Sequence, residues 1–215
     1  MTSHITSTTS RRSRLHLVAA VAASVLLLTG CNSGGDPGGT TSASPTSTAS
    51  PSATPTPTPT PAYVPASASG RAQNVPMPVL PEVAKTETKE GLEAFVRYWF
   101  QLLSYGYETG DTKPLEGISR PNCVFCTGLR DGLAAAWSDG RWVAGGTIQT
   151  PSIDANLNPG SPSQATVQVI QAQIEIRMSD GGLYQDPTKA TNRASLATAT
   201  FGDSGWVLTD LSLIR

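Results

Sequence analysis

The sequence has few histidines and few cysteines, and the shortage of histidine limits its chemistry most. Its two histidines, His4 and His16, precede Cys31, so a chain cleaved before that cysteine would keep neither. Serine–histidine and cysteine–histidine catalysis require an imidazole, as do many zinc sites. We therefore expect no active site of these kinds, no metal site and no cofactor in the rest of the chain.

The N-terminal segment also lacks an apolar run long enough to cross a bilayer. Its mostly apolar stretch, Leu15–Leu28, has 14 residues and follows three arginines, whereas a spanning helix needs about 20. This order is typical of an export signal. The next residues, Leu28-Thr29-Gly30-Cys31, match the bacterial lipobox, whose cysteine becomes lipid-modified and N-terminal. We expect residues 1–30 to be cleaved and a diacylglyceryl group on Cys31 to anchor the protein at the outer face of the cytoplasmic membrane.

Residues 31–70 have few apolar or charged side chains. Between Asn32 and Ser69, every residue is Ser, Thr, Pro, Gly or Ala except Asn32, Asp36, Tyr63 and Val64. Such a segment buries too little apolar surface to offset the entropy lost on ordering. We therefore predict that 31–70 is a disordered tether between the anchor and a single domain at 71–215.

Positive charge is not in excess in that domain. Residues 71–215 contain 12 Lys and Arg against 15 Asp and Glu, a net charge of −3, without a basic stripe. A nucleic-acid-binding surface needs such a stripe. We therefore expect no nucleic-acid partner and no electrostatically held membrane surface.

The first half of the domain has the periodicity of helices. A helix is predicted to begin at Thr86 or Thr88, both candidate N-caps, and to end near Thr109-Gly110-Asp111. Its one apolar stripe comprises Leu92, Phe95, Val96, Trp99, Leu102, Leu103 and Gly106. A short second helix is predicted over 114–118, where Pro114 suits a first turn. A third, of medium length, should follow Asn122 as its N-cap and end before Gly140.

After Gly140 the apolar period changes to two, which predicts strands over 142–156, 164–178, 193–201 and 206–214. Val167 and Val169 break the phase of the second strand, so we predict a bulge near residue 169. In the last strand, Val207, Leu211 and Leu213 should share one face. Three helices followed by a bent, antiparallel, four-stranded sheet make an α+β domain.

This order of elements resembles the nuclear transport factor 2-like fold, the superfamily of ketosteroid isomerase, in which a curved sheet wraps the first helix into a cone. The chain is also similar to an uncharacterised lipoprotein family of high-GC Gram-positive bacteria. The resembling residues are Pro76-Met77-Pro78, Glu90-Gly91-Leu92-Glu93-Ala94-Phe95, Tyr98-Trp99-Phe100, Tyr105-Gly106-Tyr107, Thr109-Gly110-Asp111 and Cys123-Val124-Phe125-Cys126. The resemblance implies the fold and the membrane location but no activity.

Cys123 and Cys126 are the only cysteines after Cys31. In an oxidising compartment the default interpretation is a disulfide that locks the start of the third helix. A thioredoxin-like redox pair is the alternative, although the motif lacks a preceding strand. Zinc is the weakest interpretation, because one CxxC supplies two ligands and no histidine completes the set.

Three functions remain open from the sequence. The first is a non-catalytic domain that binds a small apolar ligand or an envelope protein, with Phe95, Trp99, Trp142 and Ile174 as the candidate pocket lining. The second is an enzyme of the ketosteroid-isomerase type, which needs a buried carboxylate beside a phenol. Its candidate residues are Asp111, Glu116 and Asp210 with Tyr98, Tyr105 and Tyr107. The third is a structural envelope component without a pocket.

Overall fold

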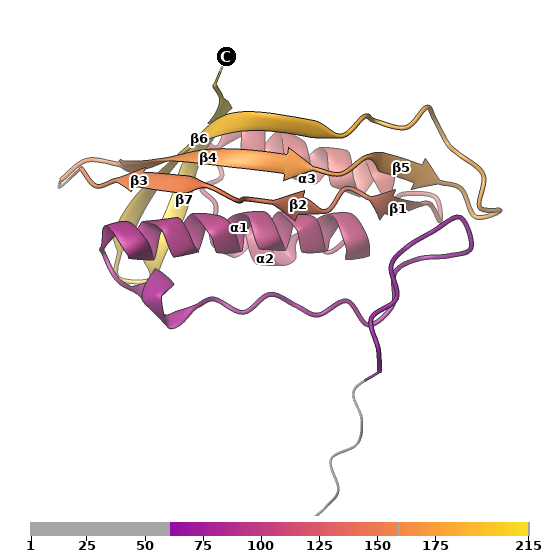
Figure 1. The fold of residues 1–215 in the computed structure, drawn as a ribbon, viewed down its shortest axis with the longest axis horizontal. Coiled ribbons are helices and arrows are strands. Elements are labelled where there is room, and N and C mark those ends of the chain that lie inside the picture. Colours follow the sequence, from indigo (N-terminus) through magenta and orange to yellow (C-terminus); the bar gives the residue numbers. More distant parts are fainter. Residues whose placement is uncertain (1–60, 159, 215) are drawn as a thin grey trace, which may run out of the picture. The chain divides into compact units, whose positions relative to one another are not determined.

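The computed structural model describes residues 61–158 and 160–214. The predicted signal segment, Cys31 and the tether up to residue 60 lie outside these residues. The described part is a mixed α+β fold in which three α-helices precede antiparallel strands, as the sequence predicts. Figure 1 shows the long first helix alongside the strands.

The helices are α1 (Lys89–Thr109), α2 (Lys113–Gly117) and α3 (Val124–Ala136). Helix α1 begins where Thr88 caps it, because the Thr88 hydroxyl accepts a hydrogen bond from the Gly91 amide at 3.0 Å. It ends at Gly110, whose φ of 78° is left-handed and favours glycine. A Cβ on Gly110 would also lie 2.7 Å from the Trp137 ring. The predicted first helix and its end at Gly110 are therefore confirmed, and of the two candidate N-caps the structure uses Thr88.

The cap of α3 differs from the prediction. We expected Asn122 to cap this helix, but the N-cap is Cys123, whose sulfur accepts a hydrogen bond from the Cys126 amide at 3.3 Å. The sequence favoured asparagine because its side chain is the stronger acceptor. The structure instead buries both cysteines in the core, and the Cys123 sulfur takes the place of the asparagine oxygen as acceptor.

A short 3-10 helix that the sequence analysis missed, η1 (Glu82–Lys85), packs against the start of α1. Its Ala84 is buried. The approach is close enough that a Cβ on Gly91 would lie 2.9 Å from the Val83 carbonyl oxygen and 2.8 Å from the Thr86 hydroxyl. Glycine at position 91 therefore permits the contact between η1 and α1.

Among the residues that the structure describes, the strands number seven, not four. They are β1 (Trp142–Gly145), β2 (Ile148–Gln149), β3 (Ile153–Asn156), β4 (Ser163–Gln171), β5 (Ile174–Arg177), β6 (Thr191–Gly202) and β7 (Gly205–Leu213). Strands β1 and β5 pair as a two-stranded sheet. The other five strands form a larger sheet, in which β4 pairs with β2, β3 and β6, and β6 also pairs with β7. The first predicted strand is divided into β1, β2 and β3, and the second into β4 and β5. The apolar pattern could not show these breaks, because a strand that changes its pairing partner can keep its period of two.

The predicted bulge near residue 169 is wrong. Strand β4 pairs with β6 without interruption, and the register shift lies between Thr198 and Ala199, opposite β7. Asp210 pairs with Thr198 and Leu208 with Ala199, so Thr209 is the extra residue. This insertion moves Leu211 to the face of Leu208. The prediction that Val207 shares the face of Leu211 therefore fails: Leu208 and Leu211 are buried, whereas Val207 is only half-buried.

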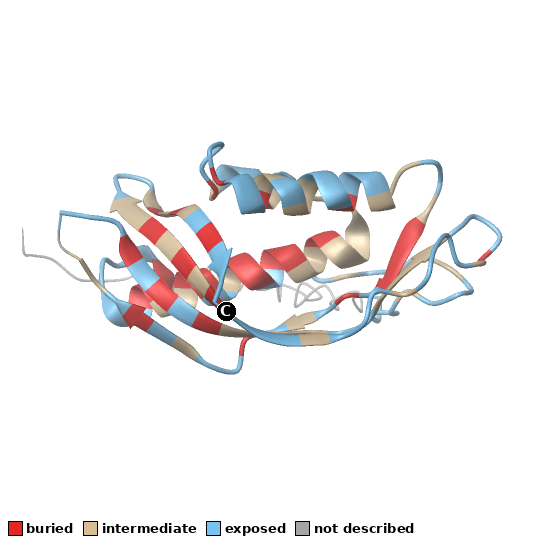
Figure 2. Cartoon of the chain, turned by 90° about the horizontal axis from the view of Figure 1, so that it is seen from above, coloured by how far each residue is buried: buried red, intermediate tan, exposed pale blue. Residues whose placement is uncertain are grey.

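The core lies between α1 and one face of the larger sheet. Large side chains come from the helix, including Leu92, Phe95 and Trp99, which are at most 2% exposed. Small side chains such as Ala165 and Ala197 come from β4 and β6. Figure 2 shows buried and exposed residues alternating along these strands. Because the sheet offers small residues, the aromatic helix can pack closely on it.

An N-terminal arm, residues 61–81, precedes η1. The tether prediction extended to residue 70, but residues 61–70 have defined contacts. Val64 and Gln73 exchange backbone hydrogen bonds at 2.9 and 3.0 Å, and the Trp142 indole donates to the Ser67 carbonyl at 3.0 Å. Arg71 lies over the Trp137 ring at 5.3 Å. Composition missed this hairpin because the tryptophans that hold it, Trp137 and Trp142, come from much later in the chain.

Candidate functional site

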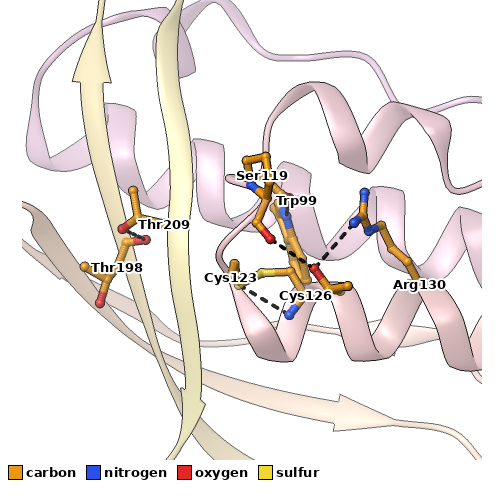
Figure 3. Close-up of a disulfide and its surroundings, with 9 residues drawn as sticks. Trp99, Ser119, Cys123, Cys126, Arg130, Thr198 and Thr209 are labelled. Atoms are coloured by element: carbon orange, nitrogen blue, oxygen red, sulfur yellow. Dashed lines mark hydrogen bonds between the residues drawn. A yellow bond between two sulfur atoms is a disulfide. The ribbon is translucent and has the colours of Figure 1, made fainter.

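The cysteine pair forms a disulfide at the start of α3, with the two Cα atoms 5.3 Å apart. Cys123 and Cys126 are 0% and 2% exposed. Figure 3 shows the bond beside Trp99 and Ser119. A buried sulfur cannot meet an attacking thiolate without local opening, so the burial favours a structural crosslink over a redox pair.

Two of the four predicted lining residues, Trp99 and Trp142, are structural. The Trp99 indole donates to the buried Ser119 hydroxyl at 2.8 Å, as Figure 3 shows. The Trp142 indole holds the arm through Ser67. Both rings are at most 6% exposed, and neither lines any of the hollows described below.

Phe95 and Ile174, the other two, line different hollows. Phe95 lies in the wall of a cleft of about 650 Å³ between η1 and the β6–β7 turn, which we call the hairpin cleft. Its charged lining residues are Lys85, Glu87 and Asp203, so the cleft has mixed charge. Ile174 lies elsewhere, beside α3. The predicted four residues therefore do not converge on one pocket.

Ile174 belongs to what we call the inner groove, two hollows of about 90 and 190 Å³ between α3 and the strands. Tyr107 and Leu129 line both hollows, which therefore adjoin. The remaining walls are mostly apolar and include Phe125 and Leu213 at the first hollow and Ile176 at the second. Their only charged residue is Arg193. The groove is thus an apolar seam with a single positive charge and no lining carboxylate.

Tyr107 is the phenol of this groove. Burial raises the pKa of its hydroxyl, and a hydrogen bond with the Gln171 side chain partly offsets that rise. The three carboxylates considered for a catalytic pair lie elsewhere. Asp111 accepts a hydrogen bond from the Lys113 amide at 3.1 Å, Glu116 pairs with Arg130 at 3.6 Å, and Asp210 is exposed on β7. The structure therefore does not place any of these three in the wall around Tyr107.

A tyrosine–carboxylate pair does occur at a place the sequence analysis missed. The Tyr63 hydroxyl donates to Glu108 at 3.2 Å in what we call the arm cleft, an opening of about 680 Å³ between residues 75–79 and α1. Burial raises the pKa of Glu108, while the hydrogen bond from Tyr63 lowers it. The two residues are 45 positions apart. Composition had assigned Tyr63 to the tether, so no local pattern could pair them.

The described residues also bear on metals and membranes. Within residues 61–158 and 160–214, no group of three His, Cys, Asp or Glu side chains is arranged to hold a metal ion. In the same ranges, no helix is both long enough and apolar enough to cross a bilayer.

Comparison with known proteins gives a family but no activity. The family model with the description "Family of unknown function (DUF6318)" matches residues 61–212. No curated protein matches the sequence. Among solved structures, the intermembrane space region of the chloroplast protein ARC6 is similar at 13% identity and a TM-score of 0.42, covering 60% of this chain and 98% of that one. At this TM-score the likeness implies nothing about function.

Proposed function

The chain belongs to the DUF6318 family of unknown function, and we propose that it is a lipoprotein of the outer face of the cytoplasmic membrane whose domain binds a protein partner without catalysis. Cys31 is the anchor, and the residues between it and the arm are the spacer. The domain is a member of the nuclear transport factor 2-like class. The order of three helices and antiparallel strands supports that assignment, and the lipobox supports the anchor.

The inner groove carries the proposal of a binding role. It presents Phe125, Leu129 and Leu213 at or near the surface, where Phe125 and Leu213 are 38% and 50% exposed. Surface apolar side chains grouped around a hollow are typical of a protein contact site. The α3 residues Gly128 and Gly132 extend this surface, and a Cβ at either position would meet nothing within 4 Å.

The size of the groove favours a protein partner over an enclosed small ligand. Small-molecule pockets have volumes of about 300–1,000 Å³. The two hollows, at about 90 and 190 Å³, are smaller. Each matches a single apolar side chain, which is how an interface residue inserts into a facing surface. We therefore assign the groove to one or two apolar side chains of another envelope protein.

The lining of the groove favours binding over the ketosteroid-isomerase type of chemistry. That chemistry needs a carboxylate beside a phenol inside an apolar pocket. In the inner groove, Tyr107 has Gln171 beside it, and the lining contains no Asp or Glu. A proton-abstracting base is therefore absent from this wall.

In-cell photocrosslinking tests the binding role. We place a benzophenone amino acid at Gly132 in the groove, with Asp131 as the matched control, because Asp131 is exposed on the same helix and does not line the groove. Irradiation of intact cells should give one discrete crosslinked protein from position 132 and none from position 131. Equal products from both positions, or no product from position 132, would contradict the proposal.

Fractionation tests the anchor separately. After cleavage the lipid on Cys31 is the only hydrophobic anchor we assign to the chain. The change Cys31→Ala should therefore release the protein from the membrane fraction. A variant that stays membrane-bound after carbonate washing would show that the lipid is not what holds it.

A further inference from the structure

The arm cleft has walls of two kinds. On one side lie residues 75–79 of the arm, which include Met77 and Val79 with 52% and 82% exposure. On the other side lie Gln101, Ser104, Tyr105 and Glu108 of α1, and the lining is completed by Tyr63, Thr147 and Ile148. The opening of about 680 Å³ falls within the range of small-molecule pockets, about 300–1,000 Å³. Its size therefore suits a small ligand, in contrast to the inner groove.

Glu108 gives this cleft its charge, because no other charged residue lines it. Within residues 61–158 and 160–214, none of the ion pairs involves Glu108. Its polar partner is the hydroxyl of Tyr63, a neutral donor. A half-buried carboxylate has lost part of its hydration, and a positive charge beside it would compensate for that loss. Such a group favours a positively charged ligand.

Two aromatic rings accompany the carboxylate. Tyr63 and Tyr105 both line the cleft, and tyrosine faces attract ammonium groups with about 0.5–2 kcal/mol. The apolar arm residues Val75, Met77 and Val79 offer contact to an aliphatic chain. A carboxylate, two phenol rings and an apolar wall together complement an organic cation and repel an anion.

We propose that the arm cleft binds a small organic cation, an alkylammonium or quaternary ammonium compound, with Glu108 as its counter-ion. Tyr63 and Tyr105 contact the cationic head, and Met77 and Val79 contact its aliphatic part. Because Tyr63 and residues 75–79 belong to the arm, the cation joins the arm to α1. Ile148 lines both the arm cleft and the first hollow of the inner groove, but the cation site shares no charged residue with the groove and does not depend on the partner proposed for it.

Choline and 3,3-dimethyl-1-butanol are the probes, because they have the same shape and differ in charge. In titrations of the full chain followed by nuclear magnetic resonance, choline should shift the amide signals of Ser104, Glu108 and Thr147 in a saturable way. The neutral alcohol should bind at least about tenfold more weakly, since it has no positive charge to pair with the carboxylate. Equal binding of the two probes, or no saturable shift with choline, would overturn the proposal.

Variants separate the charge from the fold. Glu108→Gln keeps an acceptor for Tyr63 and removes the charge, so it should weaken choline binding at least about tenfold and abolish the preference over the alcohol. Glu90→Gln removes the same charge from an exposed position of α1 outside the cleft and should leave binding unchanged. Tyr63→Phe keeps the aromatic ring and should weaken choline binding less than Tyr63→Leu does. Retention of choline binding by Glu108→Gln, with an unchanged melting temperature, would refute the site.

Discussion

Two faces of helix α1 line two sites of opposite character, the inner groove and the arm cleft. Leu103 and Tyr107 face the inner groove, where the lining has one positive residue, Arg193, and no carboxylate. Tyr105 and Glu108 face the arm cleft, where the lining has one negative residue and no positive one. A turn of about 3.6 residues places these positions on different faces. One helix can therefore line both an apolar protein contact and a cation site, and no charged residue lines both of them.

The two faces also differ in how far they contribute to stability. The face toward the core and the inner groove, the inward face, carries the side chains that fill the core. The face toward the arm cleft, the outward face, carries Gln101, which is exposed, and Ser104, which is half-buried. Substitutions on the inward face should therefore cost several kcal/mol, and those on the outward face should cost little. The predictions below test that difference from the largest effect to the smallest.

The largest effect is expected at Trp99. Trp99→Ala removes a side chain that is 1% exposed and leaves the buried Ser119 hydroxyl without its donor. The free energy of unfolding should fall by about 3–5 kcal/mol in urea denaturation. Gln101→Ala, two positions away on the exposed face, should change it by less than about 0.5 kcal/mol. Similar losses in the two variants would remove the contrast between the faces.

The disulfide should have the next largest effect. Replacement of both Cys123 and Cys126 by serine should lower the free energy of unfolding by about 1–3 kcal/mol, because the crosslinked loop is short and the sulfurs are buried. Reduction of the unchanged protein should give a comparable loss. The fold should persist in both cases, as far-ultraviolet circular dichroism would show. Fast alkylation of native, mildly reduced protein at neutral pH would instead favour a redox role.

A pair of glycines extends the comparison to the backbone. Gly91→Ala should destabilise the protein by about 1–3 kcal/mol, because its Cβ would collide with Val83 and Thr86 of the segment packed on α1. Gly132→Ala should stabilise it by about 0.5–1 kcal/mol, because Gly132 lies inside α3 with open space beside it. Thermal denaturation of the two variants checks both signs. A stabilising Gly91→Ala would mean that η1 does not pack on α1 as described.

The smallest effect is expected from pH, at Glu108. Burial raises the folded-state pKa of Glu108 above 4.5, so the folded chain binds more protons than the unfolded chain between 4.5 and the raised value. Its contribution to stability is therefore present below that window and is lost as pH rises through it. Glu108→Gln should remove this dependence, measured as the urea midpoint on either side of the window. If the urea midpoint of the variant changes with pH as it does in the unchanged protein, Glu108 is not the source of that dependence.

Tyr63 refines that prediction. Its hydroxyl donates to the ionised carboxylate and so lowers the pKa of Glu108 against the effect of burial. Tyr63→Phe should therefore raise the pKa of Glu108 further, as a carbon-detected titration of its side chain would show. A lower pKa in this variant would mean that the hydrogen bond in the arm cleft is not formed in solution.

Much of the fold could be predicted because its signals are local. The caps of α1 at Thr88 and Gly110 and the positions of α2 and α3 depend on neighbouring residues. The cysteine pair is three residues apart and forms the predicted bond. The divided strands and the bulge at Thr209 were not predicted, because the partner strand decides them.

The candidate site was predicted less well than the fold. Ile174 lies in the inner groove and Phe95 in the hairpin cleft, while Trp99 and Trp142 hold the core and the arm. An aromatic residue on an apolar stripe gives the same sequence pattern whether it fills the core or faces a cavity. The two interpretations differ only in the volume left unfilled beside the side chain, which no single element determines.

By itself, the sequence determined the apolar face of α1, the α+β order of elements and the pairing of Cys123 with Cys126, because each depends on residues a few positions apart. The tertiary structure alone decided that Tyr63 contacts Glu108 and that Tyr107 and Leu129 together line the inner groove. These contacts join residues 45 and 22 positions apart. Such a contact forms only when the packing of the core brings distant segments together and offsets the entropy of closing the loop between them.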